Sequence, residues 1–218
     1  MIQLVSIQVG RPRNHGADPA FPSGGPWTSG IFKEPVPGAV HLGLTNLDGD
    51  AQADRKVHGG PDKAVLAYAG GHYPLWRSEL GKPEISCGGF GENFTLLGTD
   101  ERTVALGDVY EIGEALVQVS QPRSPCWKLA WRWSLPSLPA RVVETGRSGW
   151  YFRVLREGKA APGEMRLLER PCAEWTVARV TGIAYDLSHH LEEAARLADC
   201  RHLSDDWRLW IRRKLGLR

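Results

Sequence analysis

The sequence predicts an α+β fold, in which a β-rich sheet or barrel over residues 1–170 precedes a small helical region over residues 171–218. Two observations support this class. The first two thirds of the chain is rich in glycine and proline and contains short apolar alternations separated by turns, a pattern typical of short strands. From about Pro171 glycine becomes sparser, and three stretches begin at polar residues that can cap helices.

Four alternating segments predict strands in the first region, at residues 3–9, 94–97, 108–113 and 115–120. The last two flank Gly113 and Glu114, and a two-residue connection of this kind predicts a β-hairpin. Two helices interrupt the strands. One begins at His72 and ends at Gly81, and the other covers residues 138–146 and also ends at a glycine, which is favoured just beyond a helix.

The C-terminal region is predicted to form three helices, which begin near Thr176, Ser188 and Ser204. The final dozen residues contain five basic and no acidic side chains. This helix is therefore a candidate docking surface for an acidic protein or a phosphate backbone. The alternative is that the helix dipole favours basic residues near its C-terminus. The predicted apolar face of the helix consists of Trp207, Trp210, Ile211 and Leu215.

Composition excludes several classes of function. A formal charge of +2, with 42% hydrophobic and 24% charged residues, gives no general reason to expect a nucleic-acid or membrane partner. No apolar run approaches the roughly 20 residues that span a bilayer, and the start lacks a basic region followed by a cleavage site, so we expect a cytoplasmic protein. Four scattered cysteines predict free thiols, at Cys87, Cys126, Cys172 and Cys200.

A basic, glycine-containing segment is the first candidate site. In ADRKVHGGPDKAV, residues 53–65, glycines allow backbone N–H groups to approach an anion while cations neutralise it. The spacing matches neither a P-loop nor GxGxxG. The alternative is a tight turn with solvated charges around it. The residues of this candidate anion cradle are Arg55, Lys56, His58, Gly59, Gly60 and Lys63.

The second candidate is Cys126 in SQPRSPCWKL, residues 120–129, where a strand is predicted to end and a helix to begin. Arg123 and Lys128 favour the thiolate, which is both the nucleophile and the metal ligand of cysteine. The alternative is a small buried apolar side chain. A third segment, GGFGENFTLLG, places Glu92 and Asn93 before a strand, where they could exchange a proton and bond a heterocycle, or form a glycine-rich turn.

A metal at Cys126 would need other ligands. Structural zinc takes about four protein ligands and catalytic zinc about three, and no Cys/His spacing supplies them. One thiolate suffices if the metal arrives already bound in an organic cofactor whose anionic group is held by the basic segment. This hypothesis places the basic segment, residues 53–65, and the Cys126 segment, residues 120–129, in one site.

Several ordered blocks together resemble a known family. ADRKVHGGPDKAV, HYPLWRSELG, GGFGENFT, LGDVYEIGEALVQVSQPRSPCWKL and TGRSGWYFRVLREG are similar to the MOSC domain, the C-terminal domain of molybdenum-cofactor sulfurases. The resemblance covers about residues 28 to 170. Trp175 onward resembles the three-helix extension of a stand-alone bacterial branch implicated in resistance to N-hydroxylated purine bases. The resemblance to the MOSC domain implies a partly barrel-like fold that binds a molybdenum-pyranopterin cofactor.

The resemblance also implies residue roles. Cys126 would ligate molybdenum. The cations of residues 53–65, together with Arg123 and Arg147, would hold the pterin phosphate, with Arg123 ranked first. The residues expected to line the pterin or the open metal positions are Glu92, Asn93, Ser120 and Gln121.

The implied reaction is reduction of N–OH to N–H with release of water, in which His58 or Glu92 relays protons. The chain has no dinucleotide fingerprint, no CxxCH and no cysteine cluster for iron and sulfur, so an external reductase or flavoprotein must donate electrons. One alternative is a carrier that uses Cys126 as a persulfide or a transient cofactor ligand. Another is metal-free hydrolysis with Cys126 as nucleophile and His58 as base.

Overall fold

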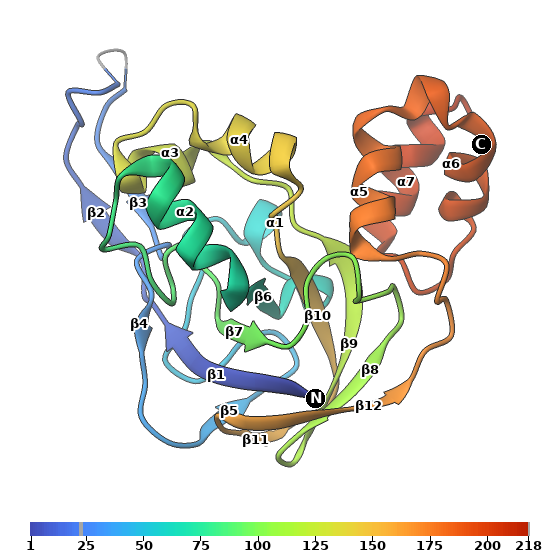
Figure 1. Ribbon diagram of the computed structural model, residues 1–218, viewed down its shortest axis with the longest axis horizontal. Helices are drawn as coiled ribbons and strands as arrows, with labels where there is room; N and C mark the ends of the chain where they lie inside the picture. The colour runs from blue at the N-terminus through green and yellow to red at the C-terminus, as the bar shows by residue number, and fades with distance from the viewer. Residues whose placement is uncertain (22–23, 218) are drawn as a thin grey trace.

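A closed sheet forms the centre of the molecule (Figure 1), a computed structural model that describes residues 1–21 and 24–217. Within these residues seven strands form a mixed barrel, because β12 pairs with β1 as well as with β8. Only β6 and β7 among them run parallel. The predicted β-rich, partly barrel-like α+β fold is confirmed. In order around the barrel, the strands are β12 (Gly163–Glu169), β8 (Val109–Ile112), β9 (Ala115–Pro122), β10 (Trp150–Arg156), β6 (Val65–Ala69), β7 (Phe94–Leu97) and β1 (Ile2–Val9).

The four strands expected from alternation are confirmed as β1, β7, β8 and β9, and β8 and β9 form a hairpin across Gly113 and Glu114. Pairing of β9 with β10 shifts register between Tyr151 and Phe152, which leaves one extra residue in β9. Bulges of this kind re-aim neighbouring side chains. This bulge lies where β9 leads toward Cys126.

Short strands decorate the barrel. The strand β4 extends the sheet beside β1, and two further pairs of strands lie outside it. The short strands are β4 (Glu34–Pro35), the pair β2 (Arg13–His15) and β3 (Trp27–Ser29), and the pair β5 (Val40–Leu42) and β11 (Gly158–Ala160). The pair β2 and β3 belongs to the arm that projects at the upper left of Figure 1.

Helices α2 (Tyr73–Leu80), α3 (Trp127–Trp133) and α4 (Leu138–Thr145) cover one side of the barrel over a second buried cluster that includes Trp76 and Phe90. The helix ends predicted at Gly81 and Gly146 are confirmed, since both glycines adopt the left-handed conformation, with φ of 62° and 68°. Two shorter elements, α1 (Arg55–His58) and the 3₁₀ turn η1 (Pro61–Lys63), precede β6.

Three helices follow the barrel in the described part of residues 171–218, as predicted: α5 (Val177–Tyr185), α6 (Leu191–Ala198) and α7 (Asp205–Lys214). Thr176 and Ser204 cap α5 and α7, with side chains that accept from the backbone N–H of Arg179 and Trp207. The predicted start of the middle helix near Ser188 is wrong. Ser188 lies in the 3₁₀ turn η3 (Leu187–His189), and α6 begins only after His190.

The helical region and the barrel share one hydrophobic cluster, which contains Trp175, Val180 and Leu197 together with barrel residues such as Val117 and Phe152. Backbone hydrogen bonds join the two regions as well, as in the 2.9 Å bond from Leu106 N to the Trp175 carbonyl. None of the helices described in residues 1–21 and 24–217 is long and apolar enough to traverse a lipid bilayer.

Candidate functional site

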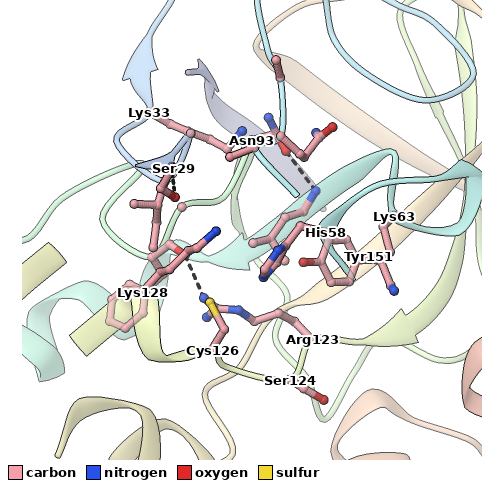
Figure 2. Close-up of a pocket in the computed structure, with 18 residues that line it drawn as sticks. Ser29, Lys33, His58, Lys63, Asn93, Arg123, Ser124, Cys126, Lys128 and Tyr151 are labelled. Atoms are coloured by element: carbon pink, nitrogen blue, oxygen red, sulfur yellow. Dashed lines mark hydrogen bonds between the residues drawn. The ribbon is translucent and has the colours of Figure 1, made fainter. Parts of the chain in front are cut away.

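A cleft of about 640 Å³, measured out to solvent, opens beside the end of β9 (Figure 2). Segments distant in sequence line it, among them the loop after β3, the α1 and η1 segment, the glycine-rich turn before β7 and the turn from β9 into α3. The polar side chains that line it are Ser29, Lys33, Gln52, His58, Lys63, Asn93, Arg123, Ser124, Cys126, Lys128 and Tyr151.

Cys126 is the N-terminal cap residue of α3, as the sequence predicts. Burial raises the pKa of its thiol. A hydrogen bond with His58 and the charge of Arg123 lower the pKa by more than burial raises it, so the pKa falls from 9.0 to about 7. The backbone N–H of Lys128 acts in the same direction. The half-buried thiol is therefore about half ionised near neutral pH, far more than an ordinary cysteine.

Arg123 is only 5% exposed, yet no described carboxylate pairs with its charge. Its Nη2 donates to the Phe90 carbonyl at 3.1 Å, while Nη1 is buried without a hydrogen-bond partner. No carboxylate in the parts of the chain that the structure describes forms an ion pair with it. A buried, unpaired charge is costly. The arrangement is that of a site prepared for an anion.

Three lysines add positive charge to the cleft, and none of the residues lining it carries a carboxylate. Lys63 pairs with Asp206 of α7 at 3.0 Å and donates to the Val57 carbonyl at 3.1 Å. Lys128 lies 5.7 Å from the centre of the Trp127 ring. The third lysine, Lys33, belongs to a buried network.

Lys33 forms a very short ion pair with Asp50, and burial lowers the pKa of its ammonium although Asp50 opposes this. Asn93 donates from Nδ2 to Asp50 at 3.0 Å and to the Gln8 carbonyl at 3.1 Å, and its Oδ1 accepts from Leu66 N at 3.2 Å. Asn93 therefore lines the cleft as predicted, but its amide is largely engaged in holding β1, β6 and β7 together.

Of the predicted cradle, His58 and Lys63 reach the cleft, whereas Arg55 and Lys56 are exposed on α1 and do not line it. Asp54 caps this short helix by accepting from Lys56 N at 3.0 Å. Gly59 and Gly60 connect α1 to η1 without lining the cleft. The turn needs glycine at position 60, where φ is 102°.

Glu92 lies outside the cleft, which corrects its expected place beside the pterin or the substrate. Its carboxylate is fully buried and accepts from Gly88 N at 2.6 Å, Phe90 N at 3.1 Å and Thr95 Oγ1 at 2.9 Å, and from the Tyr73 hydroxyl. These contacts fold the glycine-rich turn around the carboxylate. They leave it no access to a bound substrate.

Ser120 and Gln121 are likewise turned away from the cleft. Ser120 Oγ donates to the Asp62 carbonyl at 2.6 Å and to the Tyr151 carbonyl at 3.0 Å, so it fixes the η1 turn to the bulge between β9 and β10. Gln121 is buried, and its Oε1 has no hydrogen-bond partner. Neither residue lines the cleft.

Arg147 is the most distant of the predicted residues. It pairs with Glu79 at 2.8 Å, lies 4.8 Å from the ring centre of Trp76 and lines a different hollow together with His72 and Glu101. It does not reach Cys126. Sequence analysis assigned Arg147 to the candidate site because its sequence block matches the family. A position in a block does not determine where the side chain points.

Two lining residues, Lys33 and Tyr151, were missed by sequence analysis. Lys33 lies far from every motif, so nothing in its surroundings indicated a role. Tyr151 stands inside the block GWYFRV, and burial raises the pKa of its phenol, so the phenol stays protonated at neutral pH. In Figure 2 its hydroxyl group points toward the space shared with His58.

The contact between Cys126 and His58 serves two of the chemical hypotheses equally, since a metal-binding thiolate and a hydrolytic nucleophile both need a lowered pKa. Arg123 separates them, because hydrolysis requires no buried, unpaired guanidinium. Residues 1–21 and 24–217 hold no group of three or more His, Cys, Asp or Glu placed to bind a metal ion. One soft thiolate beside an anion site fits a metal that brings its own sulfur ligands.

Comparison with known proteins assigns the family. The sequence profile of the MOSC domain matches residues 54–165, and that of the YiiM-like 3-alpha helix domain matches residues 175–215. The chain belongs to the MOSC domain family. Cys126, Arg123, His58 and Lys63 all lie within the MOSC match.

Relatives of this MOSC protein share most of its length. It is 40% identical over 212 residues to the YflK protein of Bacillus subtilis. The aligned region covers 97% of this chain and 93% of YflK. The crystal structure of YiiM from Geobacillus stearothermophilus superposes with a TM-score of 0.82 at 38% identity, covering 99% of this chain and 100% of the other. A Gibberella moniliformis protein named "Reductase" is 38% identical over 206 residues, 92% of this chain but 35% of its own length.

Proposed function

We propose that this MOSC protein binds a molybdenum-pyranopterin cofactor in the cleft and reduces N-hydroxylated substrates of the hydroxylaminopurine type. The observation that carries the proposal is the pairing, in one cleft, of a thiol with a pKa of about 7 and a buried guanidinium that has no carboxylate partner among the described residues and leaves Nη1 without a hydrogen bond. A soft sulfur donor suits molybdenum already held by sulfur, and a guanidinium suits a phosphate.

Each residue of the cleft has a defined task in this proposal. Cys126 binds the metal, and Arg123 and Lys128 neutralise the anionic part of the cofactor. The cofactor supplies a two-electron reduction that cleaves the N–O bond. Two protons are consumed as N–OH becomes N–H and water. His58 and Tyr151 hold protons beside that space, and they replace Glu92, whose carboxylate is sealed inside its own turn.

Electrons come from an external reductase or flavoprotein in this proposal, since the sequence carries no motif for a redox cofactor of another kind. The relative named "Reductase" supports a redox role, but about two thirds of that protein has no counterpart here. The basic end of α7 is the candidate docking surface for the donor.

Metal and pterin analysis tests the cofactor. Protein produced in cells that make the cofactor is expected to contain about one molybdenum per chain, held through a single thiolate ligand. Cys126→Ser removes most of it, because a hydroxyl is a poor donor to a soft metal. Cys87→Ser is the matched control, since Cys87 is also a half-buried free thiol but lies outside the cleft. Full metal loading in Cys126→Ser would reject the ligand assignment.

Turnover tests the electron source. The loaded protein should be inactive alone toward 6-N-hydroxylaminopurine and become active once a reductase or a strong chemical reductant is added. Reduction without an added donor contradicts the need for a partner.

The second candidate function is a sulfur or cofactor carrier, which the lowered pKa of Cys126 also favours. A carrier's thiolate accepts sulfane sulfur from a donor persulfide and passes it on. Mass analysis after incubation with a persulfide donor would then show a gain of one sulfur at Cys126, together with transfer to an acceptor and no reduction of N–OH.

A further inference from the structure

Three tryptophans pack against one another beside the cleft. The ring centres of Trp127 and Trp131 lie 4.9 Å apart, those of Trp27 and Trp127 5.7 Å, and those of Trp27 and Trp131 5.5 Å. All three pairs meet edge to face, at angles of 63° to 82°. Because this geometry is favourable for aromatic pairs, each ring restrains the other two. The trio unites the β3 strand and the α3 helix in one rigid surface.

Trp127 remains 50% exposed within this trio. It lies between Cys126 and Lys128, both of which line the cleft, and Lys128 also places its ammonium 5.7 Å from the Trp127 ring centre. On the other side, Ser29, which follows Trp27 by two residues, lines the cleft as well. None of the three indole rings lines the cleft itself, but the trio adjoins it through Lys128, which contacts Trp127 and lines the cleft. The side chain of the trio that is most open to solvent belongs to the residue beside the reactive cysteine.

The cleft and the trio differ in chemistry. Lysines, an arginine and a histidine make the cleft cationic, and none of its lining residues carries a carboxylate. The trio next to it offers the half-exposed, apolar indole ring of Trp127. A ligand that suits both has a polar reacting group for the cleft and a planar ring for the tryptophans. The cleft itself presents only two aromatic rings, those of Phe90 and Tyr151.

We propose that Trp127, held in place by Trp27 and Trp131, is the stacking surface for the planar heterocyclic ring of the substrate. A purine-type base lies against the exposed indole with its N–OH group directed toward Cys126. The position of the reacting group rests on the proposed function. Stacking of the ring depends only on the tryptophans and is measured separately.

Equilibrium dialysis of two probes tests the surface. One probe is 6-N-hydroxylaminopurine, and the other is N-hydroxyurea, which keeps an N–OH group but has no ring. Trp127→Ala should weaken binding of the purine about fivefold or more, the lower end of what base stacking on an aromatic side chain contributes, and leave N-hydroxyurea unchanged. Trp127→Phe, which keeps a ring, should recover most of the lost affinity.

Trp210→Ala is the matched control, because Trp210 is another exposed tryptophan, 39% open, on α7 and outside the cleft. It should alter neither probe. Unchanged purine affinity in Trp127→Ala, or an equal loss for both probes, would overturn the proposal.

Metal analysis of the same variants separates other occupants and the proposed function itself. If Trp127→Ala loses molybdenum and pterin but binds the purine normally, the surface serves the cofactor ring and the proposal is wrong. If it binds both but responds less to an added reductase, the surface serves a protein partner and the proposal is again wrong. A wild-type protein without molybdenum that still shows Trp127-dependent purine binding refutes the reductase and supports the stacking surface.

Discussion

At the scale of single residues, two cysteines of this chain have opposite properties. The thiol of Cys126 has a pKa of about 7 because His58 and Arg123 outweigh its burial. Burial and the neighbouring Cys200, whose sulfur is 3.9 Å away, raise the pKa of Cys172 to about 12. The two thiols therefore differ in the fraction that is ionised at neutral pH.

We expect iodoacetamide to modify Cys126 of the metal-free protein about 100-fold faster than Cys172 at pH 7, after allowance for the lower intrinsic nucleophilicity of the more acidic thiol. The rate at Cys126 should reach half its maximum near pH 7 and level off at higher pH, where the thiolate is fully formed. Peptide mass mapping against time measures both rates. Similar rates at the two residues, or a Cys126 profile centred near pH 9, would contradict the assignment.

Arg123 should show opposite effects on stability and on cofactor retention. Replacing it with methionine removes a buried charge without an anionic partner, so the metal-free protein should unfold at the same temperature or higher. The same change should weaken retention of the cofactor by about tenfold or more, since a hydrogen bond to a charged group contributes about 1.5–3 kcal/mol. Calorimetry measures the unfolding temperature and metal analysis measures cofactor retention. Arg123→Lys is the control variant that keeps the positive charge. A large loss of stability with normal retention would mean that Arg123 is structural.

Part of the site was predictable from single residues and part was not. Cys126 with Arg123, and His58 with Lys63, were found because basic residues near a cysteine or near glycines have a direct physical meaning. Glu92 was misjudged, since a carboxylate bonded by the N–H groups of its own turn looks in sequence like one that is free to react. Lys33 enters the cleft only through the tertiary fold.

At the scale of elements, the α1 and η1 segment depends on one backbone conformation. Gly60 adopts a φ of 102°, and nothing lies within 4 Å of a Cβ added there, so alanine would meet strain but no clash.

Gly60→Ala should therefore lower the free energy of unfolding by about 1–3 kcal/mol, the cost for an L-residue of a positive-φ backbone conformation that is almost restricted to glycine. Urea unfolding measures the change. Gly25→Ala is the control, because a Cβ at Gly25 also meets no atom within 4 Å but its φ lies outside the left-handed region. Equal effects at the two positions would show that the turn tolerates a side chain.

There are physical reasons why sequence analysis did not predict some of the elements. The strand β6 is buried at every position, so VLAYA shows no alternation. The strand β12 exposes most of its side chains and buries only Met165, so its apolar pattern is weak. The strand β10 does alternate over its first five residues and was open to prediction. Ser188 carried a capping signal, but its turn forms a 3₁₀ element, and His190 occupies the cap position of α6.

At the scale of the whole molecule, the C-terminal helices belong to the same hydrophobic cluster as the barrel. They also contact a residue that lines the cleft, because Asp206 of α7 pairs with Lys63. In addition, Ser204 N donates to the Ser120 carbonyl of β9 at 3.0 Å. The family profiles match two segments, but the core that they build is shared.

The intact chain should consequently unfold in one cooperative transition. Removal of residues 171–218 should leave the barrel unable to fold stably, because it exposes the buried face that contacts Val180 and Leu197. Differential scanning calorimetry tests the first expectation and circular dichroism of the truncated chain the second. Two separate transitions in the intact protein would contradict a shared core.

Closure of the barrel has a consequence for biosynthesis. The strand β1 is the first to leave the ribosome, yet its partner β12 starts only at Gly163, so the ring cannot be completed until most of the nascent chain has emerged. Until then β1 exposes an unpaired edge, which is the kind of surface that holdase chaperones cover. The rate at which this protein reaches its native state in a cell is thus tied to the synthesis of its last strand.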